Sequence, residues 1–163
     1  VGVDSSAPVM VVGLSDAIAV SGQGSEQACA LRSTGEVACW GFNENGELGD
    51  GTRADAPLPV QVSGLLDATA ISVFGPSCAL RASGQAVCWG SNDVGQLGDG
   101  MLMASRNVPG PVNALSDAVY VSAGAYHACA IRASGRVVCW GDNSSGQLGD
   151  GTRMIRTTPV EIF

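Results

Sequence analysis

One segment that occurs three times dominates the sequence. It reads CALRSTGEVACWGFNENGELGDGT, CALRASGQAVCWGSNDVGQLGDG and CAIRASGRVVCWGDNSSGQLGDGT, and the copies start at Cys29, Cys78 and Cys129. The tryptophan of each copy recurs at a period of about 50 residues, at Trp40, Trp89 and Trp140. A repeat of that length is typical of propeller blades and solenoid turns. The sequence therefore predicts an array of similar supersecondary units.

Each copy belongs to a longer unit of short strands and tight turns. Brief apolar stretches with β-branched residues precede the cysteines, at 16–21, 67–72 and 117–122. A proline–valine pair also recurs, at Pro8, Pro59, Pro111 and Pro159, and predicts a further short strand. No stretch has apolar residues at helical spacing. We expect an all-β chain with an N-terminal segment that carries a proline–valine strand, followed by three units; the boundaries are 1–13, 14–64, 65–114 and 115–163.

The six cysteines form three pairs, each with nine residues between its members. If Cys29 faces Cys39 across a hairpin, residues 33–35 form a three-residue loop that ends in glycine, as such turns prefer. Opposed residues on antiparallel strands lie about 4.5–5.5 Å apart, and a disulfide needs about 4.4–6.8 Å between Cα atoms. The spacing predicts the disulfides Cys29–Cys39, Cys78–Cys88 and Cys129–Cys139. Free buried thiols are the alternative, and zinc is disfavoured by the long spacing and the single histidine.

Charge and cysteine usage limit the partners and the compartment. Disulfides predict an oxidising environment, and so an extracellular or secreted protein, with the periplasm or the cell surface as further options. The net charge is −7 and the arginines are scattered singly, so we expect no nucleic-acid partner. No run of apolar residues is long enough for a membrane span.

The repeated pattern, C-A-L-x3-G-x-V-x-C-W-G-x-N-x2-G-Q-L-G-D-G-T followed by proline–valine, resembles the repeat of the regulator of chromosome condensation family. It is most similar to the repeats of secreted bacterial members with paired cysteines, and the resemblance extends from about Pro8 to Ile162. It implies a β-propeller of four-stranded antiparallel blades, three of which lie in this chain. A ring normally needs 4–8 blades. The resemblance therefore implies that other chains complete the ring, that the chain belongs to a larger propeller, or that the array stays open.

Two sets of residues are expected in the core between blades. Large aromatic side chains dominate protein cores, so Trp40, Trp89 and Trp140 are predicted to pack there. The leucines of the glycine-rich loops, Leu48, Leu97 and Leu148, are expected to point inward. The aspartates of the same loops, Asp50, Asp99 and Asp150, are expected to cap turns rather than to bind calcium, because the loops lack the calcium-loop pattern. We expect no metal, no cofactor and no catalytic residue.

The repeats differ most after the G-D-G turn, where two of them carry apolar residues: Met101, Leu102, Met103, Met154 and Ile155. Exposed apolar residues on loops often mark interfaces, and methionine adapts to varied partners. The alternative is that these residues fold over the edge of the next blade.

The leading functional hypothesis is a non-enzymatic extracellular module that self-associates through its blades. The equivalent proline–valine segments at the two ends of the chain suggest a head-to-tail contact, which gives a ring if it closes and a filament if it does not. The partner is then another copy of the chain or another protein. An inhibitor or binding partner of a secreted enzyme, acting through loops of one propeller face, is the second hypothesis. Family functions diverge, and the fold alone does not decide between these hypotheses.

Overall fold

The computed structural model describes residues 6–22 and 26–162. These residues form twelve strands and no helix. The first sheet contains β1 (Ala17–Ser21), β2 (Gln27–Arg32), β3 (Val37–Gly41) and β4 (Ala56–Gln61). The second contains β5 (Ala68–Val73), β6 (Pro76–Arg81), β7 (Ala86–Gly90) and β8 (Arg106–Pro111). The third contains β9 (Ala118–Ala123), β10 (His127–Arg132), β11 (Val137–Gly141) and β12 (Arg156–Ile162).

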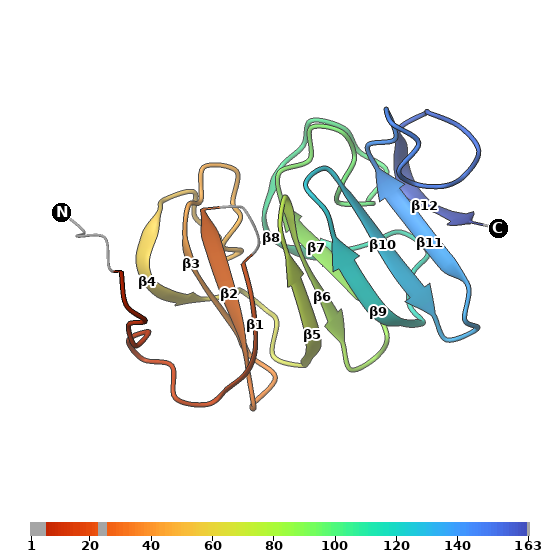
Figure 1. Ribbon diagram of the computed structural model, residues 1–163. Helices are drawn as coiled ribbons and strands as arrows, with labels where there is room; N and C mark the ends of the chain where they lie inside the picture. The colour runs from red at the N-terminus through yellow and green to blue at the C-terminus, as the bar shows by residue number, and fades with distance from the viewer. Residues whose placement is uncertain (1–5, 23–25, 163) are drawn as a thin grey trace.

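Each sheet is an antiparallel meander of four consecutive strands from one repeat. The three sheets, hereafter blades 1, 2 and 3, stand side by side in chain order (Figure 1). The first strands of neighbouring blades, β1, β5 and β9, contact one another, whereas the fourth strands lie on the outside. This arrangement confirms the predicted all-β architecture of four-stranded propeller blades.

One predicted strand is absent. Pro8 and Val9 were expected to form a proline–valine strand, but both lie outside any strand. Pro59 and Val60 lie in β4, where Val60 pairs with Cys39 of β3, and Pro159 and Val160 lie in β12, whereas in blade 2 Pro111 ends β8 and Val112 follows it. The outer edge of blade 1 is already occupied by β4, so Pro8 has no third strand to pair with.

The core lies between blades rather than within them, because successive side chains of a strand point to opposite faces. The cysteine of each hairpin strand points toward the next blade, and we call this the forward face. The adjacent tryptophan points toward the preceding blade, and we call this the backward face. The forward face of blade 1 and the backward face of blade 2 enclose one apolar cluster, which includes Leu31, Leu48, Leu65, Val87 and Trp89.

The junction of blades 2 and 3 repeats this cluster with equivalent residues, which include Leu80, Leu97, Leu115, Val138 and Trp140. Leu48, Leu97 and Leu148 are all buried, each on the loop that follows the third strand of its blade. Three blades therefore form two complete junctions.

Candidate functional site

The disulfides lie in the central hairpin of each blade. Cys29 is bonded to Cys39, Cys78 to Cys88 and Cys129 to Cys139, and each pair is directly opposed in the strand register. The Cα atoms are 4.0–4.1 Å apart, slightly closer than expected. In blade 1 the ladder bonds join Arg32 to Glu36 and Phe42 to Glu26, which makes Cys29–Cys39 a non-hydrogen-bonded pair. Cα atoms come closest at such positions.

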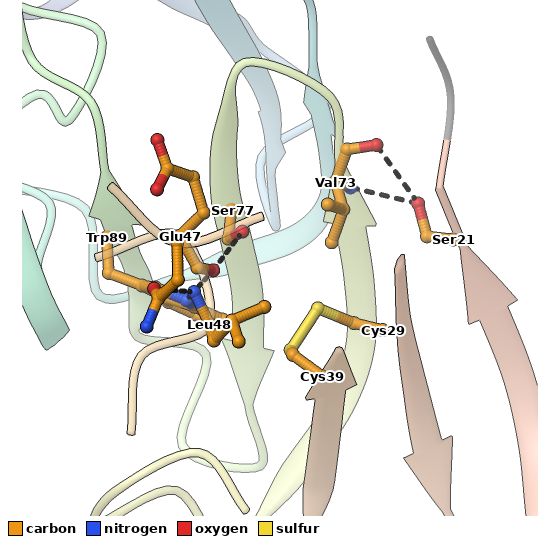
Figure 2. The surroundings of a disulfide bond; sticks show 9 residues. Ser21, Cys29, Cys39, Glu47, Leu48, Val73, Ser77 and Trp89 are labelled. Carbon is orange, nitrogen blue, oxygen red and sulfur yellow. Dashed lines mark hydrogen bonds between the residues drawn. A yellow bond between two sulfur atoms is a disulfide. The ribbon is translucent and has the colours of Figure 1, made fainter. Parts of the chain in front are cut away.

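Each blade junction is also held by the indole of its tryptophan. Trp89 Nε1 donates to the backbone carbonyl of Glu47 at 2.8 Å, and Ser77 Oγ donates to the same oxygen at 2.9 Å (Figure 2). In the next junction Trp140 Nε1 donates to the carbonyl of Gln96 at 2.9 Å. The glycine-rich loop of one blade therefore supplies an acceptor to the tryptophan of the next.

A serine near the end of the first strand links neighbouring blades a second time. Ser21 Oγ accepts from Val73 N at 2.9 Å (Figure 2), and Ser72 Oγ accepts from Ala123 N at 2.9 Å. Sequence reasoning missed this role, although a serine at the third of these positions, Ser122, repeats the pattern. Each junction thus combines an apolar cluster, an indole–carbonyl bond and a serine–amide bond.

The forward face of blade 3 carries one half of such a junction and meets no blade. Ile131 and Val137 are 36% and 38% exposed, whereas their equivalents in blade 1, Leu31 and Val37, are 2% and 0% exposed. Gln147 is exposed, and no described indole donates to its carbonyl. The forward face of blade 3 is therefore an apolar surface with an unused acceptor.

The backward face of blade 1 carries the complementary half. Trp40 is half-buried, whereas Trp89 and Trp140 are fully buried. Its Nε1 has no acceptor among the described residues, in contrast to the other two indoles. Ala17 is likewise exposed, although the equivalent alanines of β5 and β9 are buried. The predicted core position of Trp40 thus lies at an open face.

The loops after the G-D-G turns lie on the surface. Met101, Leu102, Met103, Met154 and Ile155 are all exposed. Met103 also has a positive φ of 56°, which is unusual for a residue with a side chain. These residues carry exposed apolar side chains on two loops, one in blade 2 and one in blade 3.

Asparagine and aspartate side chains organise the glycine-rich loops. Asn43 is fully buried, its Oδ1 accepts from Leu48 N at 2.9 Å, and its Nδ2 donates to the carbonyl of Ala54 at 3.0 Å. Asp50 Oδ1 accepts from Thr52 N at 2.9 Å and so caps its turn. Sequence reasoning missed the asparagine, although every copy of the W-G-x-N motif contains it.

Asp150 is the most strongly perturbed acid of these loops. A hydrogen bond from the Thr152 hydroxyl, at 2.7 Å, is the main reason that the pKa of Asp150 lies well below its ordinary value. Its other oxygen accepts from Arg156 Nε at 2.7 Å, and this bond lowers the pKa further. Within residues 6–22 and 26–162 no three acidic, histidine or cysteine side chains come together as metal ligands. Nor does this part of the chain contain a helix that could span a membrane.

Comparison with known proteins identifies the repeat. The family described as "Regulator of chromosome condensation (RCC1) repeat" matches residues 34–75 and 83–131, and a second family of the same description matches residues 118–147. Two curated relatives come from Arabidopsis thaliana. The RCC1 domain-containing protein RUG3, mitochondrial, is 34% identical over 96% of this chain and 36% of its own length. The ultraviolet-B receptor UVR8 is 33% identical over 85% of this chain and 33% of its own length.

Solved structures show the same fold. Yeast RCC1 (Prp20), solved bound to Kap60, has a TM-score of 0.82 at 21% identity, over 93% of this chain and 38% of that one. Human WBSCR16 has a TM-score of 0.80 at 21% identity, over 90% of this chain and 38% of that one. The chain spans about a third of the length of the curated relatives that it matches. Three four-stranded blades, the thrice-repeated motif and matches over more than half of the sequence lead to one conclusion: this chain belongs to the regulator of chromosome condensation (RCC1) repeat family.

Proposed function

We propose that this chain is a non-enzymatic, extracellular protein-interaction module in which the forward face of blade 3 binds the backward face of blade 1 in a second copy. The structure of yeast RCC1 bound to Kap60 is consistent with a protein-binding role for this fold. The single observation that carries the proposal is that the two open faces are the two halves of a junction that the chain already forms twice.

The polar groups of the two faces match. Trp40 would donate its indole N–H to the carbonyl of Gln147 in the other copy, as Trp89 does to Glu47 and Trp140 does to Gln96. Ser122 would accept from the Gly22 amide, as Ser72 accepts from Ala123. An indole that is buried without an acceptor is costly. The four polar groups would therefore form two hydrogen bonds in one contact.

The apolar groups match as well. Ile131 and Val137 would cover Trp40 and Ala17 of the other copy and become as buried as their equivalents in blades 1 and 2. Burial of apolar surface is the main favourable term in such associations. The contact is heterologous, so it leaves one face of each type open until the assembly closes. Two copies would supply six blades, which lies within the range of closed propellers.

The paired cysteines support the proposed extracellular compartment. All six are paired within the central hairpins, and disulfides persist in oxidising environments. We therefore place the module outside the reducing cytosol, as a secreted or cell-surface protein.

Light scattering after size-exclusion chromatography tests the contact. The substitutions Val137→Arg and Ala17→Arg place a charge on the forward and backward open faces. Both positions are exposed, so neither substitution buries a charge in the separate chain. We expect the unaltered chain to associate beyond its 16.4 kDa monomer and each variant to stay monomeric. An equimolar mixture of the two variants should form a dimer, because each retains the face that the other lacks.

Val119→Arg is the matched control, because Val119 and its equivalents Ile18 and Thr69 are exposed in all three blades. This variant should associate like the unaltered chain. A monomer at every concentration, or association that survives both face variants, would rule out the proposed contact.

Binding of a foreign secreted protein is the second candidate function. The observation in its favour is the exposed apolar surface of Met101, Leu102 and Met103, which belong to blade 2 and not to the two blades with open faces. The variant Leu102→Ser should then abolish capture of one stoichiometric foreign protein from native medium and leave self-association unchanged. If the only protein captured is the chain itself, this second function is wrong.

A further inference from the structure

A cavity of about 460 Å³ lies where the three blades meet, and we call it the blade-junction cavity. Its lining includes Glu26 and Phe42 of blade 1, Phe74 of blade 2 and Tyr126 of blade 3. Phe74 and Tyr126 lie on the turns before β6 and β10, which Gly75 N and the carbonyl of Gly124 join at 3.1 Å. The volume is typical of small-ligand sites. The cavity is distinct from the open faces, since none of the face residues named above lines it.

Two carboxylates line the cavity and lack a cationic partner. Glu26 is exposed and Glu47 is only 4% exposed, yet neither forms an ion pair within the described part of the chain. Glu47 Oε2 accepts from Asn45 N at 2.8 Å and Oε1 accepts from Asn45 Nδ2 at 2.9 Å. A buried carboxylate that has hydrogen bonds but no counter-charge remains costly. A cation in the cavity would remove that cost.

The negative charge at this position is not required by the fold. The equivalent residues are glutamines, and Gln96 Oε1 accepts from Val94 N at 2.9 Å as Glu47 accepts from Asn45 N. Gln147 Oε1 makes the same bond with Ser145 N at 2.9 Å. An amide therefore fulfils the structural role, and the charge of Glu47 is an addition at a residue that lines the cavity.

The remaining lining favours a flat cation. Three aromatic rings, Phe42, Phe74 and Tyr126, accompany the carboxylates, and aromatic faces attract cations. Guanidinium combines stacking on aromatic rings with paired hydrogen bonds to carboxylates, which an ammonium group does less well. Gln27 also lines the cavity and is buried, and its Nε2 has no acceptor among the described residues. A peptide carbonyl would satisfy that donor.

We propose that the blade-junction cavity binds an arginine side chain presented by a partner protein. The carboxylates of Glu47 and Glu26 hold the guanidinium, and the rings of Phe42, Phe74 and Tyr126 enclose it. This site is independent of the head-to-tail contact, because the two involve different residues. Each is also tested by a different measurement.

Titration by nuclear magnetic resonance tests the site, with the capped peptide acetyl-Gly-Arg-Gly-amide as the probe. We expect it to shift the amide signals of Phe42, Phe74 and Tyr126. The citrulline analogue, which has nearly the same shape and no charge, should cause no comparable shifts. Glu47→Gln should raise the Kd of the arginine peptide about tenfold, as loss of a charged hydrogen bond does. It should leave the rest of the spectrum unchanged, because the other blades carry glutamine at this position.

Glu44→Gln is the matched control, since Glu44 is exposed and does not line the cavity. Its Kd should stay within about twofold of the unaltered chain. Absence of shifts with the arginine peptide, equal binding of the citrulline peptide, or equal weakening by both glutamate variants would each overturn the proposal. None of these results bears on the mass measured by light scattering, so the two proposals can fail separately.

Discussion

At the scale of single residues, Ala114 stands out because its backbone is left-handed. Its φ is 53°, and the equivalent residue before β5, Gly64, has a φ of 68°. A residue with a side chain pays about 1–2 kcal/mol in this conformation. Glycine removes this strain from the folded state, but it also raises the conformational entropy of the unfolded chain, which lowers stability by about 0.4–1 kcal/mol. Ala114→Gly should therefore raise the free energy of unfolding by about 0.5 kcal/mol, measured in urea.

The reverse change, Gly64→Ala, should lower the free energy of unfolding by a similar amount, because a Cβ at Gly64 meets no atom within 4 Å and only the backbone opposes it. Stabilisation by both substitutions would contradict this explanation.

Asp150 is expected to make stability depend on acid pH. Its folded pKa is lowered, chiefly by the Thr152 hydroxyl, from an ordinary value of 3.8. The stabilisation is therefore complete above that ordinary value and is lost as the pH falls toward the folded pKa. Urea unfolding between about pH 5 and pH 2 should show a shallower loss of stability for Asp150→Asn than for the unaltered chain. If nuclear magnetic resonance titration of the Asp150 carboxyl carbon gave an ordinary pKa, this prediction would be wrong.

The spacing of the cysteines and the glycine of the intervening turn predicted the cysteine pairs, because a hairpin with a three-residue loop places the two cysteines opposite each other. The roles of Ser21, Asn43 and Glu47 could not be read in the same way. Ser21 binds Val73 in the next blade, Asn43 binds Ala54 eleven residues along the chain, and Glu47 lines a cavity to which all three blades contribute. The spacing of residues in the sequence does not predict such contacts, because they depend on how neighbouring blades and loops pack against one another.

At the scale of the loop and the strand that it meets, Gly49 is a position where the first junction leaves no room for a side chain. An added Cβ would lie 2.6 Å from Trp89 Nε1, on a backbone with a φ of 68°. At the equivalent Gly149, φ is 75° but no tryptophan is near, and the nearest atom is Ile162 Cγ2 at 3.2 Å. Gly49→Ala should therefore lower the free energy of unfolding by about 1–3 kcal/mol more than Gly149→Ala, as overpacking does.

Denaturant unfolding of dilute, monomeric protein measures this difference. Gly98→Ala should behave like Gly49→Ala, since its Cβ would lie 2.8 Å from the Trp140 ring. Equal losses for Gly49→Ala and Gly149→Ala would show that the backbone conformation, and not the tryptophan, sets the cost.

Strand positions were predicted well where the repeat fixed them and wrongly at Pro8. A proline–valine pair indicates an edge strand, but an edge strand forms only where a neighbour offers free ladder groups. In blade 1 the place beside β3, where such a pair lies in the other blades, is already occupied by β4. Whether a proline–valine pair finds a strand to pair with therefore depends on the whole array of blades and not on the two residues themselves.

At the scale of the whole molecule, blade 2 is the only described blade with a neighbour on both sides (Figure 1). In such arrays stability is the sum of units and of the interfaces between neighbours. Backbone amides of β6 and β7, which are almost entirely buried, should exchange with deuterium most slowly in dilute solution. Those of β1 and β12 should exchange fastest.

Raising the protein concentration then gives a second readout of assembly. Protection should increase in β1, β3, β10 and β11, which form the open faces, and should stay constant in β6 and β7. Uniform protection across all three blades in dilute solution would contradict the nearest-neighbour description.

The polarity of the indole–carbonyl bond has a consequence for how proteins of this type change over generations. Because every junction pairs the same donor with the same acceptor in the same direction, a stretch of about 50 residues can be duplicated or deleted in a gene without a new interface having to arise. The number of blades can then change from one protein to another, and selection has only to maintain the two surfaces on the first and last blades.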